Sequence, residues 1–250
     1  MASRNLTNVT LELGGNDAAL VLEDAVLDDA AFMRMYLGTF MTSGQICMAL
    51  KRLYVHKTRY DEVVDGLSRI AARQVIGDGM LPDTTMGPLN NARQLQVVSS
   101  LLAQARAGGA ELRELGEVPD PALYGAGYFQ KPVLVLDPDP NLDIVRKEQF
   151  GPALPIIRIG DEAEGIRMAN DCELGLCSSV WSADRERALR VARQFEAGTT
   201  YINNHGPLGQ DDRGPFGGFK ESGIGRNLGY EGVLGFQGYH TISAPGGWLW

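Results

Sequence analysis

The sequence predicts an α/β fold, with an open and mostly parallel sheet and helices on its faces. Short apolar runs of strand length alternate with segments whose apolar residues recur at helical spacing, a pattern typical of β-α-β units. The 250 residues are 44% hydrophobic and 22% charged. A globular chain of this length and composition can bury one large core or two smaller ones.

The apolar runs predict strands at residues 9–13, 52–56, 133–136, 153–159, 176–181 and 199–203. The helical spacing predicts helices at about residues 30–41, 60–71, 95–105, 162–169 and 184–196. Asp28 and Asp29 can cap the first helix, and Gly108 and Gly109 can end the third. The sheet should therefore be built from strands joined by helical crossovers.

The C-terminal part of the chain has a different composition. Glycines recur every few residues from 206 to 238, which predicts a loop-rich segment wrapped over a surface. If the chain resembles a family that self-associates through a C-terminal strand, that strand is expected around residues 239–243, where its edge can pair with another subunit. Trp248 and Trp250 are expected to dock on another surface, because two exposed indoles are unfavourable in water.

Charge and cysteine usage exclude several classes of function. The net charge of −8 argues against nucleic acid as a partner, and no apolar run reaches the roughly 18 residues that span a bilayer. Cys47, Cys172 and Cys177 are an odd set without regular spacing, so neither a disulfide framework nor a metal site is expected. No signal peptide is evident at the N-terminus, and a reduced cytoplasmic protein fits these features.

Glu12 is a carboxylate inside an apolar segment that ends in two glycines. If both faces of this strand were covered, as in a parallel sheet, burial would raise the pKa of Glu12 and suit it to general-base catalysis near neutral pH. If Leu11 and Leu13 face the core alone, Glu12 is simply a solvated side chain on the opposite face.

Cys47 lies between two apolar side chains, shortly after Gly44. A thiol with thiolate character could attack a carbon electrophile, and the glycine allows backbone N–H groups to approach the reacting atoms. A lone cysteine in an apolar segment fits a small buried hydrophobic residue equally well.

Glu12, Cys47 and two later segments form a series of motifs in a fixed order. The segments are Leu11-Glu12-Leu13-Gly14-Gly15-Asn16, Gly44-Gln45-Ile46-Cys47, Glu148-Gln149-Phe150-Gly151-Pro152 and Pro215-Phe216-Gly217-Gly218-Phe219-Lys220-Glu221-Ser222-Gly223-Ile224-Gly225-Arg226. With these motifs the chain resembles the catalytic half of the NAD(P)-dependent aldehyde dehydrogenase superfamily. The resemblance covers nearly the whole chain and implies oxidation of a small-molecule aldehyde to a carboxylic acid with NAD or NADP.

The resemblance implies a catalytic role for each residue of the first pair. Cys47 would add to the aldehyde as a thiohemiacetal, with its own backbone N–H as one oxyanion donor, and a thioester would follow. Glu12 would then activate the water that hydrolyses the thioester.

The same resemblance implies the binding residues. Glu148 would hydrogen-bond the hydroxyls of the nicotinamide ribose, and Phe150 would pack beside that ribose. The substrate tunnel would be lined by Ile46, Met48 and Phe216.

The resemblance also predicts a division of the chain. Residues 1–14 would be a remnant of the cofactor-domain strand and linker, residues 15–220 the catalytic domain, and residues 221–250 a C-terminal segment with the oligomerisation strand. In the family a dinucleotide-binding half precedes the Glu12 strand, so we expect a truncated chain with an incomplete cofactor site. Gly223-Ile224-Gly225 does not replace this half. The third glycine of the dinucleotide fingerprint G-x-G-x-x-G would fall at residue 228, which is Leu228.

Two other functions remain open. The chain could be a nucleotide-independent thiol esterase that uses Cys47 and Glu12, or an inactive fragment that persists as an oligomerisation module. In each case a homo-oligomer is expected, since removal of a packed half would expose apolar surface.

Overall fold

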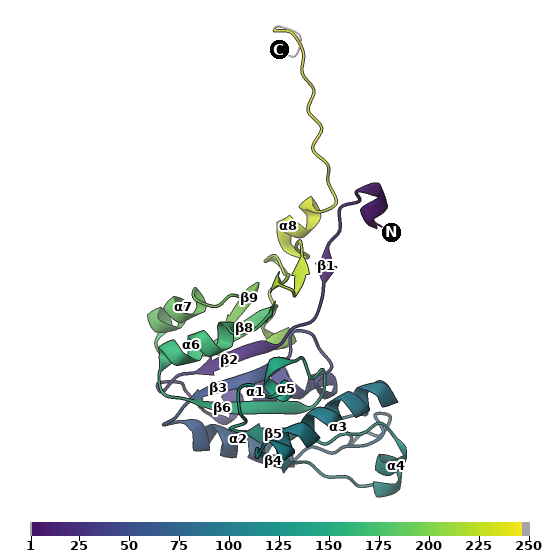
Figure 1. Cartoon of the computed structure of the whole chain (residues 1–250), viewed down its shortest axis with the longest axis vertical. Helices are drawn as coiled ribbons and strands as arrows, with labels where there is room; N and C mark the ends of the chain where they lie inside the picture. Colours follow the sequence, from purple (N-terminus) through teal and green to yellow (C-terminus); the bar gives the residue numbers. More distant parts are fainter. Residues whose placement is uncertain (1, 247–250) are drawn as a thin grey trace.

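The structure of the protein is a computed structural model that describes residues 2–246 (Figure 1). Its main sheet contains β2 (Asp17–Val21), β3 (Leu50–His56), β4 (Glu111–Glu114), β5 (Val133–Leu136), β6 (Ala153–Ile159), β8 (Cys177–Trp181) and β9 (Thr199–Ile202). The strand order is β4-β5-β6-β3-β2-β8-β9. Only β4 runs antiparallel to its neighbour, so the predicted α/β class with a mostly parallel sheet is confirmed.

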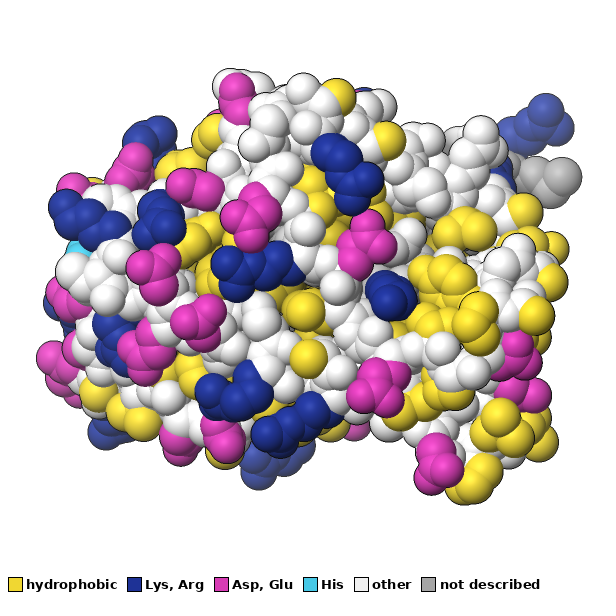
Figure 2. All heavy atoms as spheres, turned by 90° about the horizontal axis from the view of Figure 1, so that it is seen from below, with side chains coloured by type: hydrophobic (Ala, Val, Ile, Leu, Met, Phe, Trp, Pro, Cys, Tyr) yellow, Lys and Arg dark blue, Asp and Glu magenta, His cyan; other side chains and the backbone are white. Residues whose placement is uncertain are grey.

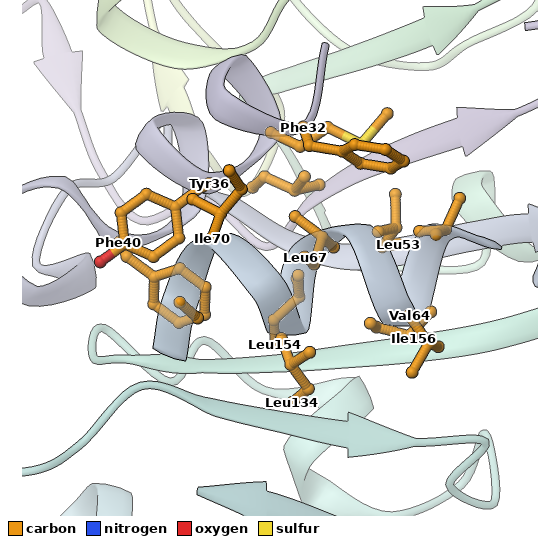
Figure 3. Close-up of a cluster of buried hydrophobic side chains, with 14 of the residues drawn as sticks. Phe32, Tyr36, Phe40, Leu53, Val64, Leu67, Ile70, Leu134, Leu154 and Ile156 are labelled. Atoms are coloured by element: carbon orange, nitrogen blue, oxygen red, sulfur yellow. The ribbon is translucent and has the colours of Figure 1, made fainter. Parts of the chain in front are cut away.

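Helices cover both faces of this sheet (Figure 1). They are α1 (Asp29–Phe40), α2 (Tyr60–Ala72), α3 (Ala92–Ala107), α5 (Asp143–Arg146), α6 (Glu162–Asn170) and α7 (Arg185–Ala192). The short helices α4 (Pro121–Ala126) and α8 (Gly229–Leu234) lie away from these faces, and Figure 1 shows α8 beside β1 (Leu11–Glu12). Figure 3 shows the core on one face, where Phe32 and Tyr36 of α1 and Leu67 of α2 pack with side chains from the strands. A second core lies on the opposite face, under α3, α5, α6 and α7.

The capping residues set the helix ends largely where the sequence predicted them. Asp28 accepts a hydrogen bond from the backbone N–H of Ala31 at 2.7 Å, and α3 ends at Gly108. The predicted helix over residues 184–196 is shorter in the structure, because α7 ends at Ala192. The side-chain amide of Asn170 binds the carbonyl of Gln194 and the N–H of Glu196, which draws this backbone away from helical pairing.

The predicted first strand is wrong in position. Within residues 9–13 only β1 (Leu11–Glu12) is a strand, and it pairs antiparallel with β11 (Gly223–Ile224), apart from the main sheet. The strand that joins the sheet is β2, which the sequence analysis missed because it begins with a carboxylate. Asp17 is tolerated there because its Oδ1 accepts a hydrogen bond from the Cys177 N–H at 3.0 Å.

The C-terminal part contains more structure than the loops that were predicted. It includes the turn η3 (Gly206–Gly209), the short β10 (Phe219–Lys220), which pairs with β7 (Leu174–Gly175), and α8. The expected strand at residues 239–243 has no ladder partner within residues 2–246, and the segment runs out as an extended exposed arm (Figure 1). Trp248 and Trp250 lie outside the described residues.

Acidic and basic side chains intermingle on the face seen in Figure 2, and no large area of one sign stands out there. Between Ala2 and Gly246, no helix combines the length and the apolar character needed to cross a bilayer. The same stretch holds no cluster of three or more His, Cys, Asp or Glu side chains that could bind a metal ion.

Candidate active site

Three of the four motifs lie on loops that enter parallel strands at one edge of the sheet. The Glu12 motif leads into β2, the Cys47 motif leads into β3, and the Glu148 motif leads into β6. Since β6, β3 and β2 are neighbours and parallel, their amino ends bring these loops together. The fourth motif reaches the same place through the pairing of β11 with β1.

The loop that carries Cys47 has an unusual backbone. Thr42, Ser43 and Gly44 follow α1 with φ angles of 49°, 60° and 73°, all in the left-handed region. The Ser43 hydroxyl donates to the Gly87 carbonyl at 2.8 Å and helps to hold this turn. A Cβ at Gly44 would lie 2.4 Å from the carbonyl oxygen of Gly151, so only glycine allows the Cys47 loop to pack on the Glu148 motif.

Cys47 itself is half-buried against a small apolar cluster. The cluster consists of Leu176, Cys177, Tyr201 and Phe216, and Met48 packs on it together with Cys47. Burial raises the pKa of the Cys47 thiol, while the charge of Lys51 and the backbone N–H of Met48 act to lower it. The negative charges of Asp17 and Glu12 also act to raise this pKa, in the same direction as burial.

Lys51 is the main residue of this site that the sequence analysis missed. Its side chain is 4% exposed, and its ammonium donates to the carbonyls of Ile46 at 2.8 Å and Cys47 at 2.7 Å. It also pairs with Glu148 Oε1 at 3.2 Å. The available signal was a lysine near the start of an apolar strand, where a buried charge requires partners.

Glu148 lies against the two glycines of the Glu12 motif. Its Oε1 accepts a hydrogen bond from the Gly15 N–H at 3.2 Å, and a Cβ at Gly14 would lie 2.5 Å from its Oε2. Within residues 2–246, Oε2 accepts no hydrogen bond, and the side chain is 22% exposed. One carboxylate oxygen is therefore held in place while the other is free to accept hydrogen bonds from a ligand.

Phe150, two residues further on, is half-buried with a positive φ of 46°. The Gln94 side-chain amide donates to the carbonyls of Gln149 and Phe150, each at 2.9 Å, which offsets the cost of this backbone conformation. The bend holds Phe150 at the same sheet edge as Glu148.

Glu12 is not buried between two covered faces, as one interpretation of the sequence required. It lies on exposed β1, opposite Gly223 of β11. Its pKa is nevertheless raised, because partial desolvation outweighs the charge of Arg226 and a hydrogen bond from Asn227. The Glu12 carboxylate is thus open to water, and its negative charge acts to raise the pKa of the Cys47 thiol.

The three proposed tunnel residues are placed unequally. Phe216 and Met48 both contact the apolar cluster beside Cys47. The Ile46 side chain is half-buried, and the contact that links this residue to the site is its carbonyl with Lys51.

Ser222 joins the fourth motif to the first. Its hydroxyl is fully buried, donates to the Gly14 carbonyl at 2.7 Å and accepts from the Gly175 N–H at 3.0 Å. Its own carbonyl accepts from the Leu13 N–H at 3.0 Å. This one residue therefore fixes the backbone of Leu13 and Gly14, next to Gly15, whose N–H donates to Glu148.

Replacement of Ser222 with alanine should lower the free energy of unfolding by about 2–4 kcal/mol, because it leaves two polar groups without a partner. Urea denaturation would measure the change. Ser99→Ala on the exposed face of α3 is the matched control and should change the stability by less than about 0.5 kcal/mol. Equal stabilities for the two variants would contradict the bridging role.

A model of the aldehyde dehydrogenase family matches residues 1–242. The chain belongs to this family. A geranial dehydrogenase from Castellaniella defragrans is 38% identical over 96% of this chain and 48% of its own length. A betaine aldehyde dehydrogenase from Brucella anthropi is 37% identical over 96% of this chain and 49% of its own length.

Solved structures agree with the sequence relatives. A Mycobacterium tuberculosis aldehyde dehydrogenase complexed with NAD+ superposes with a TM-score of 0.86 at 36% identity, over 94% of this chain and 47% of that one. The betaine aldehyde dehydrogenase of Staphylococcus aureus, also in complex with NAD+, has a TM-score of 0.85 at 34% identity, over 93% and 46%. The chain thus spans about half the length of the relatives that it matches.

Proposed function

We propose that this aldehyde dehydrogenase chain carries the catalytic half of an enzyme that oxidises a small aldehyde to a carboxylic acid with NAD(P)+. The observation that supports this most strongly is that the Cys47 carbonyl and the Glu148 carboxylate both contact one buried ammonium, that of Lys51. In this proposal residues 15–220 form the catalytic domain, and residues 221–250 form a segment for self-association.

The first step requires a thiolate. The Cys47 thiol gives up its proton to water, its sulfur bonds to the aldehyde carbon as the carbonyl π bond breaks, and the carbonyl oxygen becomes an oxyanion. The backbone N–H of Cys47 is the donor that this chain offers to the oxyanion. Met48 and Phe216 exclude water from one side of the nucleophile, since they share its apolar cluster.

Glu148 fits the nicotinamide ribose, because its unbonded Oε2 can accept hydrogen bonds from ribose hydroxyls while Lys51 and Gly15 hold Oε1. Phe150 would pack beside the same group. The bound cofactor would supply the hydride acceptor, and loss of hydride from the thiohemiacetal carbon would leave a thioester on Cys47. The solved relatives in complex with NAD+ support a nicotinamide cofactor for this chain.

The last step uses Glu12 as a base. Its carboxylate takes a proton from water, the resulting hydroxide adds to the thioester carbon, and the carbon–sulfur bond breaks to release the acid and the Cys47 thiolate. The exposure of Glu12 supports this role, since a hydrolytic base must reach water. A reducing compartment such as the cytoplasm would keep the thiol active.

A chimera tests the proposal, because the relatives are about twice as long as this chain. In it, this chain would replace the matching stretch of the Castellaniella geranial dehydrogenase. We expect it to form NADH or NADPH with aldehydes, and Cys47→Ala in the chimera to remove this activity. Ester hydrolysis by the folded chimera without any aldehyde-dependent NAD(P)H would instead favour a thiol esterase.

A further inference from the structure

Lys51 is a buried cation held by two hydrogen bonds and one ion pair. Its ammonium donates to the carbonyls of Ile46 and Cys47 and lies 3.2 Å from Glu148 Oε1. The side chain is 4% exposed, so water does not compete strongly for these contacts. Such a group costs free energy to bury, and these partners offset that cost.

The two carbonyls belong to the peptide groups on either side of Cys47. The carbonyl of Ile46 shares its peptide group with the Cys47 N–H, and the carbonyl of Cys47 shares its peptide group with the Met48 N–H. A cation on a carbonyl oxygen polarises the whole amide, which strengthens its N–H as a donor. Both donors that serve the nucleophile are therefore coupled to one ammonium.

The two N–H groups have different targets. The N–H of Met48 acts to lower the pKa of the Cys47 thiol, although burial raises this pKa overall. The N–H of Cys47 is the donor that the proposed function assigns to the oxyanion. We propose that Lys51 is a positioning residue that orients and polarises both peptide groups around Cys47 and ties them to Glu148; this inference rests on the proposed role of Cys47.

The third contact links the nucleophile to the cofactor side of the site. Glu148 neutralises part of the charge that Lys51 directs at the Cys47 loop. Removal of the Lys51 charge should therefore raise the pKa of the Cys47 thiol, and removal of the Glu148 charge should lower it. The titratable and charged groups around Cys47 on the packed elements are Glu12, Asp17, Lys51, Glu148, Cys177 and Tyr201.

The test is the pH dependence of Cys47 alkylation by iodoacetamide, measured on the Cys47 peptide by mass spectrometry. Lys51→Met should raise the apparent pKa by about one unit, so that the rate near neutral pH falls roughly tenfold. Glu148→Gln should lower the pKa and speed alkylation. Lys51→Arg, which keeps the charge, should stay closer to the native profile than Lys51→Met.

Lys147→Met is the matched control, because this exposed lysine pairs with Asp143 and lies beside Glu148 in sequence without touching the Cys47 loop. Its profile should equal that of the native chain. If Lys51→Met does not fold, the same alkylation profile is measured on Lys51→Gln. This variant removes the charge but keeps a donor for the two carbonyls. An unchanged pH profile in a folded neutral variant would overturn the proposal, as would shifts of the same sign in Lys51→Met and Glu148→Gln.

This experiment needs neither cofactor nor turnover. If the proposed dehydrogenase function is wrong, the alkylation profiles should still differ between the variants as predicted. If the Lys51 proposal is wrong, the profile of Lys51→Met should equal that of the native chain. The two results can therefore be told apart.

Discussion

Replacement of Cys47 with alanine should abolish the burst of nitrophenolate that 4-nitrophenyl acetate releases from this chain, a loss on the order of 10³-fold or more in acylation rate. The physical reason is that acylation requires a partly exposed thiol with donors beside it. Cys47 is half-buried, and Lys51 and the Met48 N–H both favour its thiolate. Stopped-flow absorbance would measure the burst.

The other two cysteines provide the controls. Cys177 is buried and its pKa is raised strongly, chiefly by desolvation, so it should acylate poorly. Cys172 is half-buried, and it does not belong to the apolar cluster against which Cys47 packs. Cys172→Ala should therefore keep the full burst. The assignment would be disproved if Cys172→Ala lost the burst and Cys47→Ala kept it.

Glu12→Gln should leave the burst intact and slow the steady state by roughly 10²–10⁴-fold, because the amide cannot take a proton from water. The reason lies in the position of Glu12, which is exposed to solvent and whose negative charge acts to raise the pKa of Cys47. Loss of this negative charge should also make Cys47 slightly easier to ionise, so acylation should be no slower.

The pH dependence gives the prediction a sign. Desolvation raises the pKa of Glu12, and only the deprotonated carboxylate can act as a base. Deacylation should therefore rise with pH through this raised pKa in the native chain, and this rise should be missing in Glu12→Gln. Glu221→Gln, at an exposed position near the same strand pair, should behave like the native chain. Equal slowing of burst and steady state in Glu12→Gln would instead indicate that Glu12 activates the thiol.

Periodicity and capping residues predicted most of the main sheet and its helices. Residues 133–136 and 153–159 are strands with the predicted bounds, and Asp28 caps α1 as expected. The central strand β2 was missed because Asp17 is typical of turns, and only its hydrogen bond with Cys177, distant in the sequence, explains its burial. Edge strand β4 was missed because it alternates charged and apolar residues, which is typical of an exposed edge.

The site shows the same difference between local and long-range information. Motifs located Cys47, Glu148 and Phe150, and the structure explains why their glycines are needed, since Gly44 packs on Gly151. Lys51 was missed because its role depends on a carboxylate almost 100 residues away in sequence, with which it pairs at 3.2 Å. One interpretation of the sequence wrongly placed Glu12 between two covered faces of a sheet. The strand before Gly14 pairs with β11 and not with the main sheet, so Glu12 is exposed.

The most direct test of the central claim is to locate the acyl group itself. The Glu12→Gln chain would be mixed with 4-nitrophenyl acetate, quenched at low pH and digested, and its peptides would be mapped by mass spectrometry. The proposed mechanism predicts about one acetyl group for each chain, on the peptide that contains Cys47. Acetyl groups on other residues with Cys47 unmodified would contradict it.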